Sequence, residues 1–140
     1  MPTIYRAMKV DGNRPLLESS ARGLGVRIGN GPLDDISITK DDEVLPETGG
    51  MSVAPSWRLL PPFRIPRRLR NEVPGATGSN QDACWRMGEG TFIKELVADN
   101  LMLRVESASH GLVEPHERCL KQSYVSALAA TRDCWVCDEK

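Results

Sequence analysis

The stretch TIYRAMKV (residues 3–10) alternates between two sets of side chains. A period of two predicts a β-strand with two distinct faces. Arg6 then shares a face with the apolar residues Ile4 and Met8, and an unpaired charge on a buried face is too costly. We therefore expect Arg6 either to pair with an internal carboxylate or to face a ligand.

Outward from this strand, shorter patterns predict further strands at residues 36–39, 48–53, 101–106, 110–114 and 135–136. Gly49 and Gly50 open the second of these, where they would let another backbone or a ligand approach closely. Residues 11–34 contain many turn signals and little periodicity, so they are expected to form a loop.

Two helices are expected. Asp82 can cap a short helix that holds residues 85–87. An amphipathic helix ending near Thr131 is predicted by apolar residues at i, i+4 and i+8, namely Leu120, Tyr124 and Leu128. We therefore expect a single small α+β domain over residues 1–140, rather than a βαβ array. The reasons are strands toward both ends of the chain, one clear helix near the C-terminus and long Pro/Gly-rich connections.

Residues 55–70 (PSWRLLPPFRIPRRLR), here named the arginine loop, contain four prolines, which exclude a long helix and a central strand. Its apolar side chains are expected to hold it to the body: Trp57, Phe63, Ile65 and Leu69. Although the formal net charge of the chain is −1, this loop has no acidic residue and five arginines: Arg58, Arg64, Arg67, Arg68 and Arg70. Such a loop can bind a pyrophosphate, a nucleic-acid backbone or an acidic protein, or can remain a solvated loop paired with the acidic remainder.

The N-terminal residues lack the basic region and apolar run of a secretory signal peptide. Nowhere does the chain have the roughly 18 consecutive apolar residues of a transmembrane helix. We expect no membrane partner, a cytoplasmic place of action and, if the protein leaves its producing cell, a route without a cleaved signal.

Four cysteines raise the question of a metal or a disulfide. Cys134 and Cys137 form a CxxC pair, which is half a zinc site, while Cys84 and Cys119 are single and distant. We expect no metal and reduced thiols. Because free cysteine behaves as a small hydrophobe, both sulfurs of the pair should be buried or half-buried in a terminal strand.

Three strings carry a family resemblance: YRA (residues 5–7), TGGMSV (residues 48–53) and HGLVEP (residues 110–115). In order and spacing they resemble the ADP-ribosyltransferase-like toxins delivered by type VI secretion. The resemblance is weakest in residues 10–40 and in the arginine loop. It implies a small split mixed β-sheet that grips NAD, as a substrate, in the cleft between its halves. It also implies action in the cytosol of a target cell and a cognate immunity protein.

The resemblance also implies residue roles. Arg6 would grip a phosphate or the ribose, since guanidinium is a planar multi-donor cation. Gly49 and Gly50 would let the chain approach the nicotinamide half of NAD. Ser52 would orient Arg6 or the ribose, and His110 would hydrogen-bond a ribose hydroxyl or the transferring group.

Four further residues complete the expected site. Transferases of this fold usually supply a Glu-x-Glu string, which does not occur in this sequence, and Glu114 is the nearest candidate for the catalytic carboxylate. Tyr5 would contact the cofactor, and Trp85 and Arg86 would stack on adenine. The reaction would be ADP-ribosyl transfer or NAD hydrolysis.

Other interpretations remain open. Arg6, Ser52, His110 and Glu114 can each be ordinary structural or surface residues, and Trp85 can belong to the core. The chain could instead be a non-catalytic module that binds nucleic acid or an acidic protein through the arginine loop, or an RNA 2′-phosphotransferase-like enzyme. The toxin hypothesis requires Arg6, Ser52 and His110 to meet on one concave surface wide enough for a dinucleotide.

Overall fold

Eleven strands form three sheets in the computed structural model, which describes residues 1–29 and 31–140. The first sheet has the order β11 (Val136–Cys137), β6 (Asp82–Met87), β1 (Ile4–Asp11), β2 (Arg14–Pro15). The second has the order β10 (Cys119–Leu120), β4 (Glu43–Gly49), β3 (Ile36–Ile38). The third has the order β5 (Met51–Val53), β9 (His110–Pro115), β8 (Leu101–Ser107), β7 (Leu96–Ala98). The α+β prediction is confirmed, but every strand pair among the described residues is antiparallel, so the expected mixed sheet is wrong.

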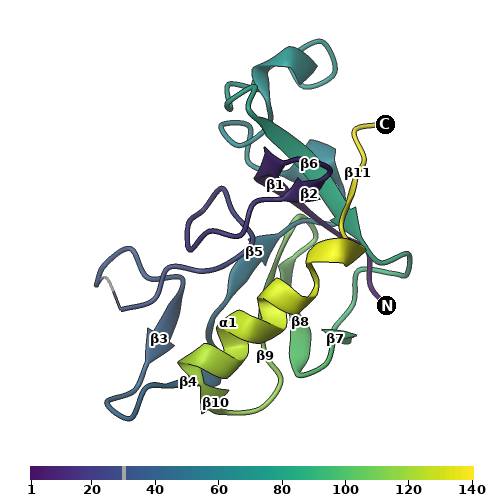
Figure 1. Cartoon of the computed structure of the whole chain (residues 1–140). Helices are drawn as coiled ribbons and strands as arrows, with labels where there is room; N and C mark the ends of the chain where they lie inside the picture. The colour runs from purple at the N-terminus through teal and green to yellow at the C-terminus, as the bar shows by residue number, and fades with distance from the viewer. Residues whose placement is uncertain (30) are drawn as a thin grey trace.

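The first and third sheets meet where β1 passes the end of β5 (Figure 1). Tyr5 and Ala54 exchange two backbone hydrogen bonds there, of 2.7 and 3.0 Å. This joint brings Arg6 beside Ser52. The predicted strand over residues 3–10 is confirmed, with Ile4, Arg6 and Met8 all buried.

The short helix expected after Asp82 is wrong, because these residues form β6, which pairs with β1 from Lys9↔Asp82 to Ile4↔Met87. Both faces of β6 are covered, so its apolar residues do not alternate and the periodic signal of a strand is lost. The Asp82 carboxylate makes an ion pair with Arg22 instead of capping a helix.

Strand β4 was predicted only at its end, because the strand expected over residues 48–53 covers its last two residues and all of β5. Pro46 lies inside it and Glu47 has a φ of 66°, two features that weaken a strand pattern. It pairs with β3 on one side and β10 on the other.

The predicted amphipathic helix is α1 (Lys121–Ala130), which lies across the strands in Figure 1. Tyr124 and Leu128 are buried, and the Tyr124 hydroxyl donates to the Val113 carbonyl of β9 at 2.6 Å. Leu120, expected on the same stripe, precedes the helix and is exposed. No described helix is long and apolar enough to cross a membrane.

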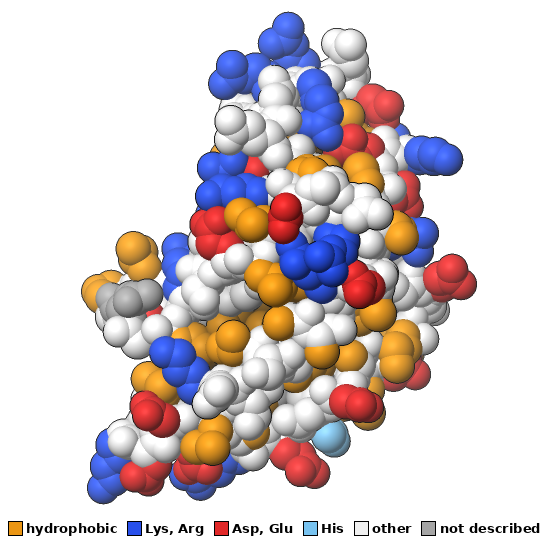
Figure 2. Space-filling view, viewed as in Figure 1, with side chains coloured by type: hydrophobic (Ala, Val, Ile, Leu, Met, Phe, Trp, Pro, Cys, Tyr) orange, Lys and Arg blue, Asp and Glu red, His pale blue; other side chains and the backbone are white. Residues whose placement is uncertain are grey.

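The arginine loop forms two 3-10 turns, η1 (Trp57–Leu59) and η2 (Arg67–Leu69). Trp57 and Ile65 are buried in a second small core, as predicted, and Leu69 packs against it. Phe63 does not attach the loop to the body, because its side chain is 61% exposed. Figure 2 shows Lys and Arg side chains gathered at the top of the molecule, where Figure 1 places this loop.

Residues 138–140, here named the tail segment, run beside β6 and contact the arginine loop. Asp138 accepts hydrogen bonds from Tyr5 and Arg86, and Glu139 from Arg68. The Lys140 carbonyl accepts from the Trp57 indole at 3.0 Å and from Arg58 at 2.9 Å.

All four cysteines are free. Cys134 and Cys137 are exposed, so the prediction that both sulfurs are buried or half-buried is wrong; Cys134 lies in the short turn η3 (Arg132–Cys134) before β11. Cys84 is buried, and its burial raises the pKa of its thiol to about 12, which leaves it protonated and unreactive at neutral pH.

Candidate active site

A pocket of about 170 Å³ opens beside the joint between the first and third sheets. It is lined from five parts of the chain: β1, the long connection between β2 and β3, β5, the arginine loop and the turn between β8 and β9. Arg6, Ser52 and His110 all line it. The structure therefore brings together the three residues on which the toxin hypothesis depends, but the pocket is narrower than the dinucleotide-sized surface that the hypothesis also requires.

Arg6 is held by backbone carbonyls. Its Nε donates to Gly23 at 3.1 Å, its Nη1 to Ser52 at 2.8 Å, and its Nη2 to Ser20 at 3.0 Å and Gly25 at 3.5 Å. Four of the five N–H groups of a guanidinium are thus in use, and one on Nη1 is left over. Burial lowers the pKa of Arg6 to about 10, so the side chain is still a cation at neutral pH. A carbonyl cage therefore takes the place of the expected internal carboxylate.

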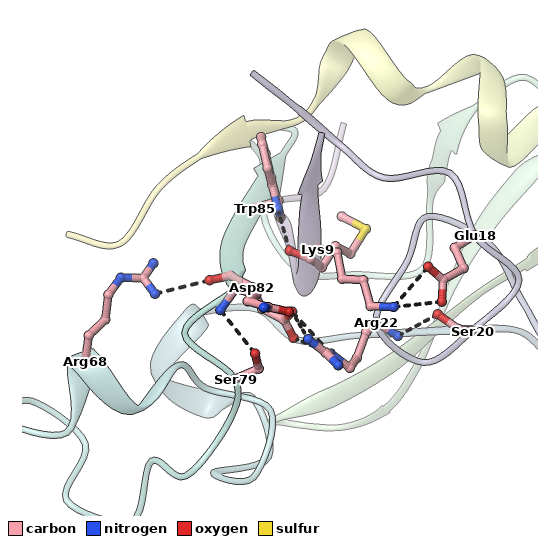
Figure 3. Close-up of polar contacts among 10 residues, drawn as sticks. Lys9, Glu18, Ser20, Arg22, Arg68, Ser79, Asp82 and Trp85 are labelled. Atoms are coloured by element: carbon pink, nitrogen blue, oxygen red, sulfur yellow. Dashed lines mark hydrogen bonds and ion pairs between the residues drawn. The ribbon is translucent and has the colours of Figure 1, made fainter. Parts of the chain in front are cut away.

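The loop that supplies this cage is fixed by two ion pairs (Figure 3). Lys9 Nζ lies 3.1 Å from Glu18. Arg22 binds Asp82 of β6 through two atoms, with Nη2 to Oδ1 at 2.7 Å and Nε to Oδ2 at 2.9 Å. Because residues 18–25 are tied to β1 and β6, their carbonyls point at Arg6 without a ligand being needed to order them.

Arg22→Ala should lower the free energy of unfolding by about 3 kcal/mol, because it leaves the buried Asp82 carboxylate without its counter-ion. Urea denaturation measures this. Arg14→Ala is the matched control, since Arg14 pairs with Asp133 on the surface and its loss should cost less than about 1 kcal/mol. Equal losses in the two variants would contradict the anchoring role of Arg22.

The register of the third sheet places Ser52 and His110 on one face. Ser52 pairs with Leu112, and His110 lies two residues before Leu112 on β9, so all three side chains point to the same side. His110 Nδ1 lies 2.8 Å from the Glu106 carboxylate. This contact orients the imidazole and leaves Nε2 free of that carboxylate.

The pocket carries an excess of positive charge. Arg6, Arg27 and Arg64 line it, against the single carboxylate of Asp35. Arg27 and Asp35 are bonded to each other, with Nη2 to Oδ1 at 2.9 Å and the Arg27 backbone N–H to Oδ2 at 2.7 Å. The net charge of these side chains favours an anionic ligand.

Gly49 and Gly50 are used for contact between backbones. A Cβ on Gly49 would lie 2.1 Å from the Asp35 carbonyl oxygen, and one on Gly50 would lie 2.5 Å from that of Val113. The Gly50 N–H also donates to the Asp35 carbonyl at 2.8 Å. The two glycines thus set the position of Asp35. Neither glycine lines the pocket, so the structure gives no support to their predicted approach to nicotinamide.

Glu114 is buried, not on the surface. Its carboxylate accepts from the Glu47 backbone N–H at 2.7 Å and lies 3.3 Å from Arg104 Nε. It shares a face of β9 with His110, but four residues of strand put the two about 13 Å apart. The structure therefore does not place Glu114 with the three pocket residues.

The remaining predicted cofactor residues lie elsewhere. Trp85 is in the main core, where its indole N–H donates to the Met8 carbonyl at 3.0 Å. Tyr5 and Arg86 are cross-strand partners, and both bond Asp138 of the tail segment. None of the three lines the pocket.

Two of the five arginines of the arginine loop form ion pairs with acidic residues, which lowers the positive charge that the loop presents. Arg58 pairs with Glu72, and Arg68 pairs with Glu139 and donates to the Asp82 carbonyl. This agrees with the interpretation of a loop paired with the acidic remainder of the chain, and gives less support to a continuous nucleic-acid surface.

Sequence reasoning did not find Arg27, Asp35 and Ser109 as pocket residues, and it assigned Phe63 to holding the loop on the body. Arg64 was named only as one of five arginines in a loop that can bind an anion. The run of arginines was the one signal that pointed to Arg64. Within residues 1–29 and 31–140, no three His, Cys, Asp or Glu side chains are grouped so that they could hold a metal ion.

Compared with known proteins, the chain matches no protein-family model and no curated sequence.

Proposed function

We propose that this chain is an ADP-ribosyltransferase-like enzyme that binds NAD with its nicotinamide end in the pocket and breaks the nicotinamide–ribose bond. The observation that carries the proposal is the meeting of Arg6, Ser52 and His110, which come from three distant strings, in one pocket. The excess positive charge of that pocket suits the pyrophosphate of NAD.

The chemistry requires stabilised positive charge on the ribose and a nucleophile that loses a proton. Nicotinamide leaves as a neutral molecule with the electron pair of the broken bond. His110 Nε2 would take the proton of the attacking water or acceptor hydroxyl, and Glu106 would stabilise the resulting imidazolium. Attack by water gives ADP-ribose and one proton, and attack by an acceptor gives an ADP-ribosylated product.

The other two residues would position the substrate. Ser52 is exposed at the pocket, so its hydroxyl can hydrogen-bond the ribose. Arg6 would act mainly as a positioning residue, because most of its donors are used by the carbonyl cage and one of its backbone partners is Ser52 itself.

The family resemblance extends the proposal to biology. The enzyme would be a toxin that acts in the cytosol of a target cell after type VI secretion, and its producer would need a cognate immunity protein that blocks the pocket. Growth arrest on cytosolic expression, relieved by His110→Ala, would support this role.

The direct test is nicotinamide release from NAD by the purified protein. We expect His110→Ala to lower the rate by about 100-fold, the low end of the effect of removing a general base, and Ser52→Ala to lower it by about tenfold. The matched controls are His116→Ala and Ser37→Ala, which alter exposed residues that do not line the pocket. Background rates in the wild type and all four variants would overturn the proposal.

A further inference from the structure

The pocket is too small for a whole dinucleotide. Its volume of about 170 Å³ lies below the roughly 300–1,000 Å³ of typical ligand sites. If the nicotinamide riboside end lies near Ser52 and His110, the ADP portion must extend past the rim. The residues at the rim therefore decide how the outer portion of the ligand is held.

Arg64 is the cationic residue at this rim whose N–H groups are available to a ligand. Among the pocket arginines, Arg6 is engaged by carbonyls and Arg27 by Asp35. The half-buried Arg64 makes no ion pair in the part of the chain that the structure describes, and its guanidinium packs over an aromatic ring. A guanidinium in this setting can donate two parallel hydrogen bonds to a phosphate.

Phe63, the preceding residue, supplies that ring. The Arg64 guanidinium carbon lies 4.8 Å from the ring centroid, and the Phe63 side chain is 61% exposed at the pocket. Exposed aromatic rings beside cationic side chains bind nucleotide bases by stacking. The pair thus joins a phosphate donor to a stacking surface.

The backbone holds this pair in place. Pro61 and Pro62 fix two φ angles, the Arg64 N–H donates to the Pro61 carbonyl at 2.8 Å, and the Thr77 N–H donates to the Pro62 carbonyl at 3.1 Å. The following residue, Ile65, is fully buried. A loop already ordered in this way loses little entropy when a ligand binds.

We propose that Phe63 and Arg64 form an outer nucleotide site, in which Arg64 binds the diphosphate and Phe63 stacks on the adenine of a ligand whose other end enters the pocket. The assignment of that other end rests on the proposed function. The outer site itself predicts binding of ADP without any reaction.

The test is calorimetric titration of the protein with ADP, adenosine and inorganic pyrophosphate. We expect Arg64→Gln to weaken ADP and pyrophosphate binding by about tenfold or more and to leave adenosine unchanged. We expect Phe63→Ala to weaken ADP and adenosine binding by about tenfold and to leave pyrophosphate unchanged. Arg67→Gln and Leu59→Ala are matched controls, since both residues are exposed on the arginine loop and do not line the pocket.

The outcomes separate the two proposals. If both variants weaken ADP binding and the wild type releases no nicotinamide, the outer site is supported and the proposed NAD cleavage is overturned. If NAD cleavage depends on Ser52 and His110 but Phe63→Ala and Arg64→Gln both leave ADP affinity unchanged, the outer site is overturned and the proposed NAD cleavage stands. A wild-type protein that does not bind ADP would also overturn the outer site.

Discussion

Arg6→Ala should unfold the protein or lower its free energy of unfolding by at least about 4 kcal/mol. The variant leaves carbonyls at Ser20, Gly23, Gly25 and Ser52 without their donor and opens a cavity where the buried side chain was. Small domains are stable by only about 5–15 kcal/mol, so this loss is a large fraction of the total. Urea denaturation followed by circular dichroism measures it.

The comparison variant is Arg6→Lys, which keeps the charge but offers fewer donors and should recover part of the lost stability. A melt of Arg6→Ala that coincides with the wild type would show that the carbonyl cage contributes little. The expected instability also limits activity tests, because loss of nicotinamide release in Arg6→Ala would not by itself indicate a role in catalysis. Ser52 and His110 are better probes of the chemistry.

Gly49→Ala should destabilise the protein by about 3 kcal/mol or more. The new Cβ would lie 2.1 Å from the Asp35 carbonyl oxygen, which belongs to backbone that cannot move without disturbing the pairing of Ile36 with Gly49. The φ of 133° at Gly49 adds strain for any residue with a side chain. Thermal and urea unfolding without NAD would both show the loss.

Gly12→Ala separates strain from crowding, because Gly12 has a φ of 66° but open space around its Cβ position. We expect that variant to lose only about 1 kcal/mol. If Gly49→Ala unfolds like the wild type and loses only NAD binding, then Gly49 serves a ligand, as the sequence suggested, and not the approach of two backbones.

Elements with a strong local period were predictable from the sequence. Alternation identified β1 and β8, and spacing of four identified α1 through Tyr124 and Leu128. Where tertiary contacts cover both sides of an element, as in β6, the period disappears, and Asp82 then resembles a helix cap. The rest of strand β4 was missed for a different reason, since Pro46 argues against a strand when its partners are unknown.

The site was predictable in part. The family resemblance of the three strings implied that Arg6, Ser52 and His110 would meet. In the structure, a strand joint and a cross-strand register bring them together. Asp35 and Phe63 lie in connections whose positions depend on long-range hydrogen bonds and on a second core. No local pattern encodes such contacts, so the rim of the pocket could not be inferred from residue types alone.

The mouth of the pocket depends in part on the tail segment, which does not line the pocket. Glu139 accepts a hydrogen bond from Arg68, and the Lys140 carbonyl accepts from Arg58 and Trp57. These three donors lie on either side of the turn that presents Phe63 and Arg64. Trimming or displacing residues 138–140 would remove these contacts on both sides of the turn, while its own backbone hydrogen bonds and the buried Ile65 would remain. The mouth of the pocket would then lose part of its support even though every residue lining it remained unaltered.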